Sequence, residues 1–205
     1  MLENTRQLGL ERGLSIATSL NPAEQFPQPD ASFPLVACRV AAHHFNDREA
    51  FLEESRRVLK PGGHFLLIDG RGPDEEPEAA DWIHQVEKLR DPSHERFLSP
   101  AEWSAHCGRH GLSVLRCENA RFKQPDLEWY FHTTATPEEN RVAACGLVRT
   151  APEAARRVFR ISEEEGKTIW WWPRLTLRVV KLCTIPNGGD RPDETSLDLH
   201  PSVLG

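Results

Sequence analysis

The stretch from Arg57 to Asp69 constrains the fold more than any other part of this chain. Its Lys-Pro-Gly-Gly segment predicts a helix end followed by a tight turn, because proline cannot continue a helix and glycine adopts turn conformations freely. The continuous apolar run Phe65 to Ile68 then predicts a central strand that is covered on both faces. Asp69 places a carboxylate at the end of that strand, where open α/β sheets bind their ligands.

Further helices and strands are predicted on both sides of this stretch. Asn46 and Glu49 resemble a capping box, so a helix is predicted to start there and to bury one apolar face. Ser99-Pro100-Ala101-Glu102 predicts a second capped helix start, and Thr136 a third. Strands are predicted at residues 14–17, 36–40, 112–115 and 175–182, and helices at residues 3–12, 78–89, 99–111 and from 136 onward. This alternation predicts a parallel, right-handed α/β sheet.

Length and composition favour one globular domain. The 205 residues are 39% hydrophobic and 27% charged, which is enough apolar sequence for a single core. We assign residues 1–186 to that domain. After Pro186 the sequence is rich in Asn, Gly, Asp, Pro and Ser, so residues 187–205 are predicted to be a disordered tail. Three consecutive tryptophans, residues 170–172, fit a core or interface strand better than an aromatic wall for a flat substrate.

Charge and cysteine content narrow the compartment and the partners. A net charge of -6, with no run of Lys or Arg longer than a pair, argues against nucleic acid and anionic membranes as partners. No segment approaches ~18 uninterrupted apolar residues, so we predict no membrane span. The five cysteines are odd in number and widely spaced, which argues against a disulfide framework or a zinc site. These features predict a cytoplasmic protein.

Five segments of the chain follow one another at a spacing that is typical of a known family: Pro22 to Pro27, Ser32 to Val36, Ala42 to Phe45, Arg57 to Asp69, and Arg90 to His94. In this order they resemble the downstream half of the class I S-adenosylmethionine-dependent methyltransferases. The similarity is strongest to the ubiquinone/menaquinone-type enzymes of the methyltransferase type 11 family. The resemblance implies a Rossmann-like sheet, S-adenosylmethionine as cofactor and a small molecule as methyl acceptor.

The resemblance starts downstream of the family's glycine-rich loop. Neither the Gly-x-Gly loop nor the acid that follows the second strand has a counterpart in this sequence, and Pro22 and Pro34 stand where the family has acids. We therefore expect a truncated methyltransferase sheet without the first strand-helix-strand unit. Its exposed edge would be covered by a second copy, by a partner chain or by residues upstream of a misplaced start. An alternative function is a non-catalytic, methyltransferase-like scaffold that binds a partner.

The resemblance also assigns candidate site residues. His43 and His44 follow a strand end, where an imidazole could orient the acceptor or take its proton, which makes them the catalytic candidates. The cofactor-binding candidates are Ala23, Glu24, Arg39 and Val40, and the substrate-binding candidates are Asp69, Asp91 and His94.

Each polar candidate also has a purely structural explanation. One of the two adjacent histidines would pack in the core while the other faces solvent. Asp69 could cap the turn that follows its strand, and Asp91 could start a proline-bearing turn that His94 satisfies. No metal is predicted, because no third ligand lies at a recognisable spacing from His43 and His44.

Overall fold

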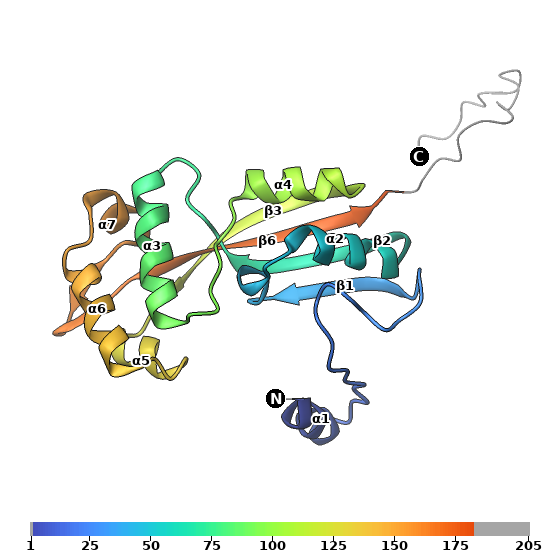
Figure 1. The fold of residues 1–205 in the computed structure, drawn as a ribbon, viewed down its shortest axis with the longest axis horizontal. Helices are drawn as coiled ribbons and strands as arrows, with labels where there is room; N and C mark the ends of the chain where they lie inside the picture. The colour runs from blue at the N-terminus through green and yellow to red at the C-terminus, as the bar shows by residue number, and fades with distance from the viewer. Residues whose placement is uncertain (1, 183–205) are drawn as a thin grey trace, which may run out of the picture.

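The computed structural model describes residues 2–182, and its centre is a four-stranded mixed sheet with the order β1-β2-β6-β3 (Figure 1). The predicted tail from residue 187 lies outside the described residues. β1 and β2 are parallel, whereas β6 is antiparallel to both of its neighbours. The strands are β1 (Phe33–Arg39), β2 (Leu59–Gly70), β3 (Leu112–Lys123) and β6 (Trp171–Lys181).

The prediction of an all-parallel sheet is wrong at β6. After β3 the chain forms three helices beyond the carboxyl end of that strand and then re-enters the sheet from the same end (Figure 1). A parallel strand would need a crossover back to the opposite end of the sheet, so β6 runs antiparallel.

Seven α-helices and a short 3-10 helix accompany the sheet in the described residues. α2 and α4 pack beside the sheet, whereas α3 and α5 to α7 gather at the end where β3 finishes and β6 begins (Figure 1). A small hairpin joins β4 (Ser162–Glu164) to β5 (Lys167–Ile169). The helices are α1 (Leu2–Glu11), η1 (Ala42–His44), α2 (Arg48–Val58), α3 (Pro77–Arg90), α4 (Pro100–Arg109), α5 (Leu127–His132), α6 (Glu138–Arg149) and α7 (Glu153–Phe159).

Two hydrophobic clusters form the core. The first lies between the sheet and the helices α2 and α4, and includes Phe65, Leu67 and Trp103. The second joins α3, α6 and α7 around Trp170, which is fully buried, so the prediction of a core position for the tryptophan run is confirmed at this residue. The site described below lies where these two clusters meet.

The predicted strand at residues 14–17 is absent from the structure. Leu14 and Ile16 are exposed, and the Ile16 side chain folds back against Gly9 of α1 instead of pairing with a strand. A short apolar run becomes a strand only where a neighbouring strand takes its backbone hydrogen bonds, and no strand lies beside this one in residues 2–182.

The predicted helix caps are correct at one position and wrong at two. At α4, Ser99 and Glu102 form the full reciprocal capping box. At α2 the cap is Asp47, whose side chain accepts from the Ala50 N–H, instead of Asn46. At α6 the residue before the helix is Pro137, and the Thr136 hydroxyl donates to the Arg90 carbonyl instead of capping.

Glu49 is therefore free of the predicted capping role and joins α2 to α4. Its carboxylate accepts hydrogen bonds from His106, His110 and Arg109. Desolvation raises the pKa of Glu49, but these hydrogen bonds outweigh it and lower the pKa to about 2. The pairing holds α2, which follows the candidate site, against the helix that begins at Ser99.

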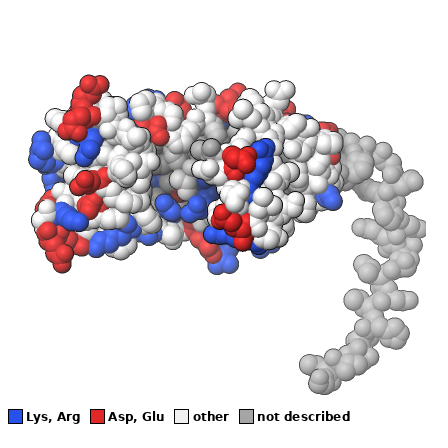
Figure 2. All heavy atoms as spheres, turned by 90° about the horizontal axis from the view of Figure 1, so that it is seen from below, with Lys and Arg blue, Asp and Glu red and all other residues white. Residues whose placement is uncertain are grey.

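Charged side chains of both signs are interspersed on the face of the molecule shown in Figure 2. No helix among the described residues is both long and apolar enough to cross a bilayer.

Candidate functional site

The first part of the site is a hydrogen-bonded histidine–aspartate pair between neighbouring strand ends. His43 lies in η1, directly after β1, and Asp69 lies near the end of the parallel strand β2. The His43 Nδ1 atom is 2.6 Å from Asp69 Oδ1, and the His43 backbone N–H donates to Asp69 Oδ2 at 2.9 Å. The two side chains are only 10% and 2% exposed. Parallel neighbours end at the same sheet edge, which is why residues far apart in sequence meet here.

This geometry selects one tautomer of His43. An ionised carboxylate only accepts hydrogen bonds, so Nδ1 carries the proton that is shared with Asp69. The Gly70 N–H also donates to Asp69 Oδ1, at 2.8 Å, so the carboxylate accepts three hydrogen bonds and is held in place. In the neutral ring the Nε2 atom is then left as a proton acceptor.

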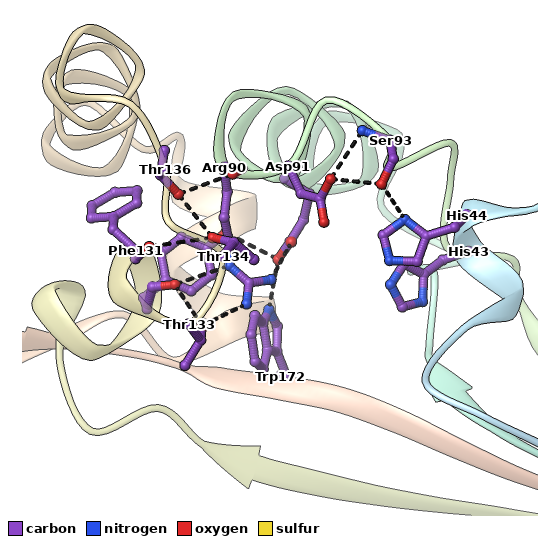
Figure 3. Close-up of polar contacts among 12 residues, drawn as sticks. His43, His44, Arg90, Asp91, Ser93, Phe131, Thr133, Thr134, Thr136 and Trp172 are labelled. Atoms are coloured by element: carbon purple, nitrogen blue, oxygen red, sulfur yellow. Dashed lines mark hydrogen bonds and ion pairs between the residues drawn. The ribbon is translucent and has the colours of Figure 1, made fainter. Parts of the chain in front are cut away.

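His44 is held in the same manner through a serine (Figure 3). The Ser93 hydroxyl donates to Asp91 Oδ1 at 2.6 Å. The Ser93 Oγ atom also lies 2.9 Å from His44 Nδ1. Because the serine proton points to Asp91, the His44 Nδ1 atom must donate to the serine oxygen. His44 Nε2 is therefore a second acceptor, and the two imidazole ring centroids are 4.1 Å apart.

Asp91 also starts a turn, as the structural explanation for this residue expects. Its carboxylate accepts from the Ser93 N–H at 3.0 Å, and its carbonyl accepts from the His94 N–H at 2.9 Å. Desolvation opposes ionisation, but the hydrogen bonds from Ser93 and the nearby His44 hold the pKa of Asp91 below its usual range. One carboxylate therefore both shapes the loop and orients His44.

His94 is the most buried of the predicted substrate-binding residues, at 1% exposure. Its ring packs against the rings of His43, His84 and Phe97, at centroid distances of 5.4, 5.8 and 4.7 Å. Neither ring nitrogen has a hydrogen-bond partner within residues 2–182. Burial, together with the neighbouring His43, lowers the pKa of His94 to about 3, so the ring is neutral near pH 7.

A buried network anchors the segment that carries Asp91, Ser93 and His94 (Figure 3). The Glu87 carboxylate accepts from the Tyr130 hydroxyl and from Trp172 Nε1, each at 3.0 Å, and it pairs with Arg90 at 3.0 Å. The Arg90 guanidinium also lies 4.5 Å from the Tyr130 ring centroid. Sequence reasoning missed this network, although Glu87 and Arg90 are spaced for a helical i,i+3 pair.

The predicted cofactor-binding residues fall in two places. Arg39 is the last residue of β1 and Val40 follows it, beside the His43–Asp69 pair, and the Val40 N–H donates to the Ile68 carbonyl at 2.7 Å. Val40 has a φ of 51°, a strained conformation for a β-branched residue, and such strain concentrates at ligand sites. Ala23 and Glu24 lie elsewhere: Ala23 packs on the core and Glu24 lines a hollow along α2.

The structure therefore brings together both catalytic candidates and all three substrate-binding candidates, with Arg39 and Val40 beside them. Ala23 and Glu24 have no hydrogen bond or ion pair to this group within the part of the chain that the structure describes. The same part of the chain contains no group of three or more His, Cys, Asp or Glu arranged to hold a metal ion.

Known proteins match this sequence. The methyltransferase domain family matches residues 1–67. The uncharacterized methyltransferase YcgJ of Bacillus subtilis is 41% identical over 171 residues, which cover 82% of this chain and 67% of that protein. The uncharacterized protein YafE of Escherichia coli is 39% identical over 104 residues, which cover half of each chain.

Solved structures give the same assignment. The crystal structure of YcgJ superposes with a TM-score of 0.79 at 28% identity and covers 90% of this chain and 79% of that one. A geranyl diphosphate C-methyltransferase from Streptomyces coelicolor, at 13% identity, has a TM-score of 0.53, covers 88% and 57% of the two chains, and supports the fold alone.

A mixed α/β sheet with polar residues at its strand ends defines a Rossmann-like methyltransferase fold. The chain belongs to the class I S-adenosylmethionine-dependent methyltransferase family. The Rossmann-like α/β fold class and the methyltransferase family resemblance predicted from the sequence are thereby confirmed, whereas the predicted truncation of the sheet stays a prediction.

Proposed function

We propose that this protein transfers a methyl group from S-adenosylmethionine to a nucleophilic atom of a small molecule. The observation that carries the proposal is the His43–Asp69 pair, a buried imidazole whose Nε2 is left as a base beside two strand ends. The small-molecule acceptor is in keeping with the ubiquinone/menaquinone-type relatives, which are named as C-methyltransferases.

The residues present fit the cofactor at two points. The Thr18 hydroxyl is shielded from solvent and has no hydrogen-bond partner, and the half-buried Glu24 carboxylate has none within residues 2–182. Thr18 precedes and Glu24 lies within the segment Pro22 to Pro27, which resembles the family segment that contacts the adenine. Ala23 and Glu24 would therefore hold the adenine, and Arg39 and Val40 would line the rest of the cofactor. The Streptomyces methyltransferase named above was solved with S-adenosyl-L-homocysteine.

The bound cofactor supplies a methyl group that is electrophilic because it is attached to a positively charged sulfur. Methyl transfer depends mostly on holding the acceptor in line with that methyl group, and few acid or base groups are needed. His43 Nε2 accepts the proton that the acceptor loses, and Asp69 stabilises the resulting imidazolium through Nδ1. His44, fixed through Ser93, orients the acceptor, and the buried rings of His94 and Phe97 keep water from that side.

The test is a transfer assay with methyl-labelled S-adenosylmethionine and three acceptor classes: an amine, a phenol and a carbon acid. The expected result is label in at least one acceptor class, in excess of a blank without protein. A folded protein that labels none of the three classes would contradict the proposal.

A second candidate function, a non-catalytic methyltransferase-like protein that binds a partner, is favoured by one observation. β1 is an edge strand of the described sheet, and its Phe33 and Leu35 side chains are 37% and 53% exposed. An uncovered apolar edge is typical of a strand that pairs with another chain. Sedimentation velocity across a concentration series separates this candidate from a monomeric enzyme, because self-association through β1 would raise the sedimentation coefficient with concentration.

A further inference from the structure

A hollow of about 530 Å³ opens beside the site, between the start of α3 and the start of α4. Its volume lies in the range of small-molecule pockets. His94 separates it from the catalytic pair, since the His94 ring packs on His43 on one side and lines the hollow on the other. The hollow is lined by loop residues 72–74, by α3 residues 77, 80, 81, 83 and 84, by residues 94, 96, 97 and 99, and by α4 residues 101 and 102.

Unused hydrogen-bonding groups line this hollow. Both ring nitrogens of His94 are buried and without a partner, and His84 Nδ1 is buried and without a partner as well. Buried polar atoms without a hydrogen bond are destabilising and uncommon in folded proteins. A neutral imidazole has one acceptor nitrogen and one N–H, so a ligand that donates hydrogen bonds into the hollow would satisfy one ring nitrogen of His94 and, in the matching tautomer, His84 Nδ1.

The charged side chains that line the hollow favour a ligand with a positive charge. Asp74 and Asp81 line it, and neither has an ion-pair partner in the described residues. Arg96 is neutralised by Glu102, to which it is hydrogen-bonded. Burial raises the pKa of Asp74, and the neighbouring Glu102 and Glu75 raise it further, although the nearby Arg71 opposes them.

We propose that this hollow binds the ammonium group of a small amine, with N–H groups directed at His84 and His94 and the positive charge balanced by Asp74 and Asp81. Phe97 adds an aromatic surface that attracts cations. The ammonium nitrogen has no lone pair. That this molecule is also the methyl acceptor, through another of its atoms, rests on the proposed function, whereas the binding itself does not.

The test is an NMR titration of the imidazole signals with benzylamine, compared with neutral benzyl alcohol and anionic benzoate. His94→Phe assigns the His94 signals. Benzylamine is expected to shift them saturably and to bind at least about fivefold more tightly than either analogue, as one added ion pair implies. Equal binding of benzyl alcohol, or no movement of the His94 signals, would overturn the proposal.

Two charge-neutralising variants on the same helix sharpen the test. Asp81→Asn removes a carboxylate of the hollow and is expected to weaken benzylamine about threefold or more. Glu78→Gln removes an equal charge from α3 outside the hollow and is expected to leave the affinity unchanged. Equal affinities of the two variants would contradict the site. His43→Asn should bind benzylamine like the wild type, so loss of the proposed catalytic role would leave this result intact.

Discussion

Replacing His43 with asparagine is expected to slow methyl transfer about 10²- to 10⁴-fold, the usual contribution of a positioned general base. The asparagine amide can still donate to Asp69, so the loop after β1 keeps its anchor while the Nε2 acceptor is lost. The measurement is kcat with methyl-labelled S-adenosylmethionine and an acceptor that the wild type methylates.

The control for this variant is His106→Asn. His106 is a histidine on α4 that binds Glu49 and lies outside the site. It is expected to change kcat less than about twofold, because it is not placed near the strand ends. A His43→Asn protein that is folded and turns over within a few fold of the wild type would show that the imidazole is a packing residue only.

Acid is expected to destabilise the protein through His94. The pKa of this ring falls from 6.5 to about 3 on folding, since burial disfavours the charged form. Between these values the unfolded chain binds a proton at His94 and the folded chain does not, so the free energy of unfolding falls as pH falls. The limiting slope for one proton is about 1.4 kcal/mol per pH unit, and the whole window is worth about 5 kcal/mol.

The test compares urea unfolding of the wild type and His94→Phe from about pH 6 to pH 4.5, inside this window. Phenylalanine keeps a ring against Phe97 but cannot titrate. The slope of the free energy of unfolding against pH is therefore expected to correspond to about one proton fewer in the variant than in the wild type. His132→Phe makes the same replacement at an exposed position on α5 and is expected to keep the wild-type slope. Equal slopes for the wild type and His94→Phe would mean that the ring is not buried as a neutral group. The titratable groups that face the His94 ring are His43, His44, His84 and Lys88.

Local sequence signals were sufficient for much of the fold. The Ser99–Glu102 capping box starts α4 at the predicted residue, because both hydrogen bonds of that motif form within one turn. The buried strand before Asp69 follows from a continuous apolar run. The meeting of His43 with Asp69 is also predictable, because both follow neighbouring parallel strands.

Features that depend on distant parts of the chain were not predictable in the same way. The antiparallel direction of β6 depends on where α5 to α7 return the chain. The contact between Ser93 and His44 spans 49 residues, and the contact between Glu87 and Trp172 spans 85 residues. The cap at Asp47 instead of Asn46 is a choice between two adjacent residues with similar capping preference. Polar pairs of this kind have no periodicity for a sequence pattern to reveal.

The most direct test of the central claim is calorimetric titration of the purified chain with S-adenosyl-L-homocysteine, the product form of the cofactor. We predict saturable binding that Glu24→Gln weakens about tenfold, as the loss of a charged hydrogen-bond acceptor implies, and that Glu128→Gln on the exposed face of α5 leaves unchanged. No binding by a protein shown to be folded would contradict the methyltransferase function proposed for this chain.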